Sequence, residues 1–263
     1  MKTGRTLPPR LRRRQLLSVL IAAAALGTLS LGGAACKGRF GNMISRSQEV
    51  DLGRQAQRDV ERKYKIEDDP AVNARMGRIA ARIFPQARRD YDVPYEVRVI
   101  DSKEVNAFAL PGGPIYFYRG LIELAGSDDE IAAVLGHEAA HVSKRHSARQ
   151  ISDAQAKGTI ASILTQGKSD LVQVLANIGL TLDQLRYSRG DESESDRVGF
   201  RYLTEACYDP DAMASFFRKM QEKAGRGGPE WLASHPLTRK RVEQAEKMAA
   251  DYKQGRGDGG VAR

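Results

Sequence analysis

Cysteine is scarce in this sequence, whose 263 residues include only Cys36 and Cys207. A small fold held together by several disulfides is therefore excluded, and a Cys36–Cys207 pair is the one disulfide that an oxidising compartment would permit. Hydrophobic residues make up 41% of the chain and charged residues 29%. This composition supplies enough apolar side chains for a packed core, so we expect a folded domain rather than wholesale disorder.

Acidic residues are absent from residues 1–35, which carry six basic residues. Removing those six charges from the formal net charge of +9 leaves +3 for the rest of the chain. A nucleic-acid-binding surface needs a strong and clustered basic footprint, which so small an excess does not supply. We therefore expect no nucleic-acid partner.

Long hydrophobic runs are also missing. The most apolar stretch, residues 16–31, is short and rich in Ala, Gly and Ser, so a permanent transmembrane helix is the weaker interpretation. Basic residues at 10–14 precede this stretch and small residues follow it, which is the order found in bacterial signal peptides. We interpret residues 1–35 as a signal peptide. The Arg13-Arg14 pair leaves both secretory and twin-arginine export open.

Cys36 directly follows the small residues 32–35, where bacterial lipoproteins carry their lipidated cysteine. Gly33 stands where lipoproteins usually have Leu, and a plain cleaved signal is the alternative. We predict that Cys36 is lipidated, with residues 36–47 as a tether, and that the lipid holds the protein to a membrane. The expected location is the periplasmic face of the cell envelope. Lys37 favours the outer membrane by analogy, and a soluble periplasmic protein is the alternative.

Residues 48–253 are predicted to form the folded domain, followed by a disordered tail at residues 254–263. Alternating apolar residues predict three short strands at 95–100, 106–110 and 115–118. Helical spacing predicts helices at 48–65, 70–84, 128–150, 152–166, 169–187, 191–206, 211–224 and 236–253. Pro85 is expected to end the second of these helices. The expected fold is therefore α+β, mainly helical, with a small three-stranded sheet beside the helix that begins after Ser127.

The residues from His137 to His141 match the pattern H-E-x-x-H. Positions i and i+4 lie about 40° apart around a helix axis, so both imidazoles face the same way and can bind one metal ion. Glu138, next to the first histidine, can remove a proton from a water on that metal. Neutral nitrogens, a carboxylate and an open position suit zinc. The alternative is two histidines with a structural role.

Two histidines and a water leave one protein ligand to be found. The extended motif with a third histidine requires Gly at position 144 and His at position 147, where this sequence has Lys144 and Ser147. His146 lies about 140° from His141 on a continuous helix. We therefore expect His146 to point away from the metal, in a structural or substrate-side role.

Glu192 and Asp196 lie one turn apart at the start of a predicted helix, and hence on one face of it. Glu192 is a candidate for the third ligand, and Asp196 is a candidate acceptor for the free N–H of a ligand histidine. Glu194 points to the other side. The alternative is that acidic residues are placed there only because they interact favourably with the helix dipole.

Four segments together resemble one family of metallopeptidases, which includes bacterial HtpX, mitochondrial Oma-type proteases and the CAAX prenyl endopeptidase. They are NAFALPGGPIYFYRGL (residues 106–121), LGHEAAHVSKRH (135–146), SRGDESESDRVGF (188–200) and SHPLTRKRV (234–242). The similarity is greatest to periplasmic lipoprotein members.

The resemblance implies a zincin-like fold of the gluzincin type, one Zn²⁺ per chain and endopeptidase activity. It implies His137, His141 and Glu192 as zinc ligands, Glu138 as the general base and Asp196 as the acid behind a ligand. Ser195 departs from the family pattern, which usually has Ala at this position.

Other residues receive further roles. Ile115, Tyr116 and Phe117 are predicted to bind substrate, on an edge strand that adds an extended peptide; a core strand is the alternative. Asn106 is a further predicted substrate-binding residue. His235 is predicted to be a transient fourth ligand or an oxyanion donor, with a structural role as the alternative. Arg189 is predicted to support the Glu192 helix by an ion pair. Residues 160–185 are a predicted lid.

The expected function is that of a zinc metalloendopeptidase, a hydrolase that cleaves unfolded or misassembled envelope proteins in protein quality control. Its partners would be protein or peptide substrates and, through the lipid anchor, a membrane. The competing hypothesis is a membrane-tethered chaperone or assembly factor whose metal site is latent. The sequence makes no prediction of the oligomeric state.

Overall fold

The computed structural model describes residues 44–156, 187–224 and 228–256. The predicted signal peptide, the lipidation site at Cys36 and the predicted lid at 160–185 lie outside these residues. Within them, no helix has both the length and the apolar character that a membrane-spanning segment needs.

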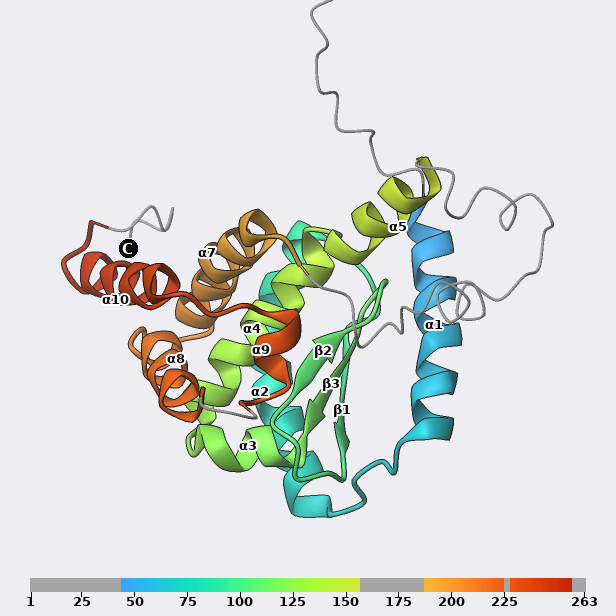
Figure 1. The fold of residues 1–263 in the computed structure, drawn as a ribbon, viewed down its shortest axis with the longest axis horizontal. Helices are drawn as coiled ribbons and strands as arrows, with labels where there is room; N and C mark the ends of the chain where they lie inside the picture. The colour runs from blue at the N-terminus through green and yellow to red at the C-terminus, as the bar shows by residue number, and fades with distance from the viewer. Residues whose placement is uncertain (1–43, 157–186, 225–227, 257–263) are drawn as a thin grey trace, which may run out of the picture. The chain divides into compact units, whose positions relative to one another are not determined.

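The predicted α+β architecture, mainly helical with one three-stranded sheet, is confirmed (Figure 1). The strands are β1 (Glu96–Ile100), β2 (Ala107–Ala109) and β3 (Pro114–Tyr118). The helices are α1 (Arg46–Lys63), α2 (Pro70–Asp90), α3 (Arg119–Ala125), α4 (Asp128–Ser143), α5 (His146–Ala156), α7 (Arg189–Glu205), α8 (Ala212–Lys223), α9 (Trp231–Ser234) and α10 (Arg239–Lys253). The short helices α3 and α9 were not predicted.

Strand β3 is the centre of the sheet, which has the order β1-β3-β2. It pairs in parallel with β1 and antiparallel with β2. Alternate residues of β3 enter two different cores: Ile115 and Phe117 join the core that contains α2 and α4, whereas Tyr116 and Tyr118 pack under α1. The prediction that this segment is an edge strand is therefore wrong, because β3 is covered on both faces and both sides.

Helix α2 continues through Pro85, contrary to the prediction that this proline ends it. A proline inside a helix removes one backbone hydrogen bond and costs about 3 kcal/mol. The apolar stripe of α2 nevertheless continues past Pro85 to Ala87, which is fully buried. Burial of the whole stripe against the core offsets the local cost.

The predicted helix at 128–150 is two helices. Helix α4 begins at the N-cap Ser127, whose side chain accepts a hydrogen bond from the backbone N–H of Glu130, and it ends at Ser143. Arg145 then adopts a left-handed conformation with φ of 56°, and α5 begins at His146. The break changes the direction of every side chain that follows it.

Helices α4 and α7 cross at two glycines, Gly136 and Gly199. A Cβ atom at Gly136 would lie 2.8 Å from the carbonyl oxygen of Gly199, and one at Gly199 would lie 2.8 Å from the backbone nitrogen of His137. Both distances are shorter than real Cβ atoms show, so only glycine permits this approach. The crossing places the first histidine of the H-E-x-x-H pattern directly against α7.

We predict that Gly199→Ala lowers the free energy of unfolding by about 1–3 kcal/mol, as overpacking at a rigid contact does. Gly77→Ala is the matched control, because Gly77 is also helical and no atom lies within 4 Å of its added Cβ. The control should stabilise the protein by up to about 1 kcal/mol, through helix propensity. Urea unfolding of both variants measures the difference, and equal effects would contradict the close crossing.

Candidate metal centre

The sequence has four histidines, and all four are buried in one region of the structure. His137 and His141 project from α4, His146 begins α5 and His235 follows α9. The Nε2 atoms of His137 and His141 are 3.0 Å apart. The carboxylate of Glu192, from the first turn of α7, lies 3.6 Å from the first of these nitrogens and 3.4 Å from the second.

These three side chains fit a tetrahedral zinc site. Zinc bonds of about 2.0–2.2 Å place neighbouring ligand atoms about 3.3–3.6 Å apart, close to the separations observed here. Two imidazoles and one carboxylate are also the donor set found in catalytic zinc sites. His137, His141, Glu192 and His235 together form a group whose potential ligand atoms all lie within 4.8 Å of one another.

The protonation states favour metal binding. Burial lowers the pKa of His141 well below its usual value, so the ring is neutral near pH 7 and keeps a lone pair for a metal. Burial alone would raise the pKa of Glu192, but the adjacent His235 and His141 lower it by more. The net shift is downward, so Glu192 is a carboxylate.

Asp196 lies behind His137, with its Oδ1 atom 3.0 Å from Nδ1 of the ring. Arg241, from the first turn of α10, donates two hydrogen bonds of 2.7 Å to the Asp196 carboxylate, one to each oxygen. The same guanidinium lies 2.6 Å from Oε2 of Glu192. Burial would raise the pKa of Asp196, but Arg241 and His137 hold it below its usual value.

Arg241 occupies the place that the sequence assigned to Arg189. Arg189 is exposed at the start of α7, and none of the residues described in the structure forms an ion pair with it. The available signal was the segment SHPLTRKRV, in which Arg241 lies six residues after His235. Its connection to Glu192 and Asp196 depends on how α10 packs, which sequence spacing does not reveal.

Glu138 and His235 face each other beside the cluster. Oε1 of Glu138 accepts a 3.3 Å hydrogen bond from the indole N–H of Trp231 and lies 3.5 Å from Nε2 of His235. Its Oε2 is buried and has no hydrogen-bond partner among the described residues. The indole stacks on His235, with ring centroids 4.8 Å apart. Trp231, the only tryptophan in the chain, was missed in the sequence.

His235 joins the ligand cluster through its other nitrogen. Nδ1 lies 3.3 Å from Nε2 of His137 and 3.1 Å from Oε1 of Glu192. Burial lowers the pKa of His235, but Glu192 and Glu138 raise it by more, so the net shift is upward.

His146 does not point away, as a continuous helix would require. Because α4 ends before it, its ring turns back, and its Nδ1 lies 2.8 Å from Nδ1 of His141. This is the side of His141 opposite to the nitrogen that faces His137. The direction expected from a continuous helix was wrong because the left-handed Arg145 breaks the helix. His146 nevertheless lies outside the group of His137, His141, Glu192 and His235, which agrees with the expectation that it is not a ligand.

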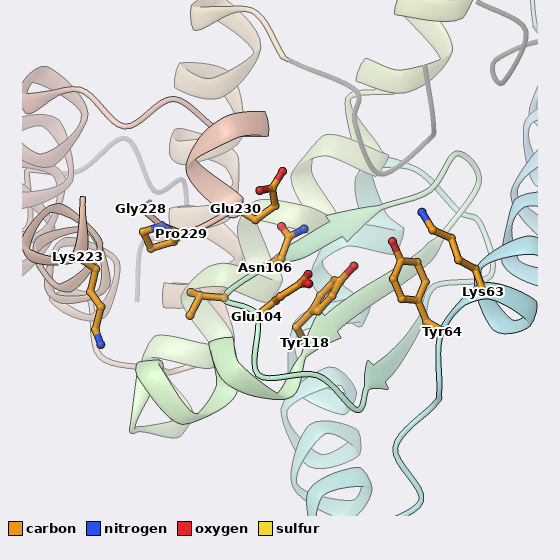
Figure 2. A pocket seen from close by; sticks show the side chains of 10 residues that line it. Lys63, Tyr64, Glu104, Asn106, Tyr118, Lys223, Gly228, Pro229 and Glu230 are labelled. Carbon is orange, nitrogen blue, oxygen red and sulfur yellow. The ribbon is translucent and has the colours of Figure 1, made fainter. Parts of the chain in front are cut away.

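The predicted substrate-binding residues divide into two groups. Ile115, Tyr116 and Phe117 are fully buried in the central strand, so a peptide cannot pair with them, and the prediction for these three is wrong. Asn106 precedes β2, which is one of the two edge strands of the sheet. It lines a pocket of about 560 Å³ together with Tyr64, Tyr118 and Glu230 (Figure 2). Glu230 immediately precedes Trp231, whose backbone N–H donates to the carbonyl of Val105, another residue that lines the pocket.

Residues 70–249 match the model of peptidase family M48. The chain belongs to this family. It is 27% identical over 258 residues to the beta-barrel assembly-enhancing protease of Escherichia coli, covering 90% of this chain and 52% of that protein. It is 29% identical over 214 residues to the mitochondrial metalloendopeptidase OMA1 of Schizosaccharomyces pombe, covering 78% and 62%.

The predicted family is thus confirmed, and the prediction of a metalloendopeptidase agrees with it. The chain spans about half the length of the bacterial relatives that it matches.

For this M48 site we predict that Arg241→Gln lowers the free energy of unfolding by about 3–5 kcal/mol, because it leaves two buried carboxylates without their cation. Added Zn²⁺ should recover part of the loss. The matched control is Arg189→Gln, at an exposed residue, which should change stability by less than about 0.5 kcal/mol. Urea unfolding with and without metal tests both variants, and a larger effect at Arg189 would contradict the arrangement.

Proposed function

We propose that this chain is a zinc-dependent endopeptidase of the bacterial cell envelope that cleaves unfolded or misassembled envelope proteins. One observation carries the proposal: His137, His141 and Glu192 converge in a buried cluster beside the carboxylate of Glu138. Family membership supports the reaction class, and the name of the bacterial relatives supports the location.

A bound zinc ion would polarise the scissile carbonyl and make a water molecule more acidic. His137, His141 and Glu192 would hold that ion. The Trp231 indole fixes Oε1 of Glu138 by its hydrogen bond, which leaves Oε2 to accept the proton of the attacking water. Glu138 then returns the proton to the leaving amine.

Arg241 and Asp196 would orient the site without touching the substrate. The guanidinium contacts Oε2 of Glu192, the same oxygen that faces His137, and the Asp196 carboxylate lies 3.0 Å from Nδ1 of His137. Such partners fix the orientation of a ligand and raise its basicity.

Strand β2 is the better candidate for peptide binding. Asn106 and Leu110 bond to β3, so the backbone groups of Ala107 and Ala109 are directed to the other side, where β2 has no neighbouring strand among the described residues. An extended substrate would pair there by strand addition, with the pocket beside Asn106 at the end of the strand. Both alanines are buried in this structure, so pairing requires this edge to become accessible.

The proposed location depends on the N-terminal sequence. Lipidation of Cys36 would attach the domain to a membrane at the periplasmic side, with the outer membrane as the preferred site. Without lipidation, the domain would be released into the periplasm after cleavage of the signal. Membrane fractionation of the wild type beside Cys36→Ser distinguishes the two.

We predict that Glu138→Gln lowers kcat for an unfolded protein substrate by at least about 100-fold, because the general base is lost. The variant should still bind one Zn²⁺ per chain, since Glu138 is not a ligand. Metal content and the rate of substrate cleavage, measured on the same samples, test this.

A wild-type chain that binds no zinc would overturn the proposal. A Glu138→Gln variant that still prevents aggregation and still replaces the wild type in cells would favour the assembly factor instead.

His235 yields a separate prediction. With Nδ1 in the ligand cluster, this residue would fill the position that a water needs, so His235→Ala should raise kcat and weaken zinc binding. If His235 serves instead as an oxyanion donor, the same variant should lower kcat and leave zinc affinity unchanged. Cleavage rates and zinc titration of His235→Ala decide between the two roles, and His235→Gln controls for loss of volume.

A further inference from the structure

His146 forms a chain of contacts that leads away from the metal centre. Its Nδ1 is 2.8 Å from Nδ1 of His141, and its Nε2 is 3.1 Å from Oε2 of Glu194. Its side chain is fully buried. Arg149, one turn further along α5, donates to Glu194 and to Asp191, at 3.3 and 3.0 Å. The His146 ring therefore contacts the imidazole of His141 through one nitrogen and the carboxylate of Glu194 through the other, and Arg149 holds that carboxylate.

The positions of the ring protons follow from these contacts. Two ring nitrogens 2.8 Å apart require one donor and one acceptor. A neutral His141 that binds a metal through Nε2 carries its proton on Nδ1, so it must donate to His146. The proton of a neutral His146 then lies on Nε2, where Glu194 accepts it. Each nitrogen in this series has one role, and no buried donor is left without an acceptor.

We propose that His146 is a positioning residue for the metal ligand His141, which it joins to the carboxylate of Glu194. The chain His141–His146–Glu194 would fix the tautomer and the ring plane of His141, which is the role proposed above for the carboxylate of Asp196 beside His137. This inference rests on the metal site of the proposed function.

A second metal site explains the same residues less well. His146, Asp191 and Glu194 have ligand-type side chains within 4.8 Å of one another. However, the Arg149 guanidinium already supplies a positive charge to both carboxylates, and Nδ1 of His146 is directed at His141 rather than into an open space. Arg149 and His141 therefore already contact the atoms that would have to bind an ion.

Ser195 is the internal control for this geometry. Its hydroxyl oxygen lies 3.3 Å from Nδ1 of His146, whereas Nδ1 of His141 lies 2.8 Å from the same atom. Ser195→Ala removes this second contact and leaves the contact between the two histidines intact. If Ser195 rather than His141 were the important neighbour, this variant would reproduce the effect of losing His146.

The test is the zinc dissociation constant of the purified full-length chain, measured by competition with a chelator. We expect His146→Leu to raise it about 10–100-fold, the usual effect of losing a group that orients a ligand. His146→Asn keeps an acceptor at the δ position and should bind zinc more tightly than His146→Leu. Ser195→Ala should match the wild type.

Equal zinc affinity in the wild type and a folded His146→Leu would overturn the inference and leave the proposed function intact. A wild type that binds no zinc would overturn both. Should His146→Leu fail to fold, nitrogen NMR of the zinc-loaded wild type decides: we expect the proton of His141 on Nδ1 and that of His146 on Nε2. Protonation of His146 on Nδ1 would overturn the inference.

Discussion

The close crossing of α4 and α7 is the constraint on which the metal centre depends. Neither helix carries the whole cluster: α4 supplies His137, His141 and Glu138, and α7 supplies Glu192 and Asp196. Gly136 and Gly199 allow the two backbones to approach until one contacts the other. At that distance, short side chains such as Asp196 and Glu192 reach the histidine rings directly. Larger residues at the crossing would separate the helices and leave each half of the site incomplete.

The buried carboxylates of the cluster need positive charge beside them, which explains the presence of Arg241 and favours a bound cation. Glu138, Glu192 and Asp196 are all buried, and burying a carboxylate without a partner is costly. Arg241 contacts two of these carboxylates and provides one positive charge, and a divalent cation would add further positive charge beside them. Without the ion, the raised pKa of His235 allows its ring to supply part of that charge.

Sequence patterns predicted the features that are set by residues close together in the chain. They missed the features that are set by contacts between distant residues. The helical spacing within the H-E-x-x-H segment was sufficient to place both imidazoles on one face. The spacing of Glu192 and Asp196 made Glu192 a candidate ligand, and the resemblance supported that choice. The left-handed Arg145 was not predictable, because its guanidinium is held by Glu49 and by the carbonyl of Ile44, about a hundred positions earlier. The place of β3 in the sheet and the contacts of Arg241 likewise follow from tertiary packing.

The residues that hold Arg145 in place lie outside the segment that matches the family model. Residues 70–249 match the family model, but Ile44 and Glu49 precede them. Their contacts hold the turn that directs His146 back toward His141. A non-glycine residue in the left-handed region costs about 1–2 kcal/mol, so the turn needs such contacts to persist. Because this turn sets the position of His146 beside His141, the start of α1 is part of the structure that positions the histidine cluster.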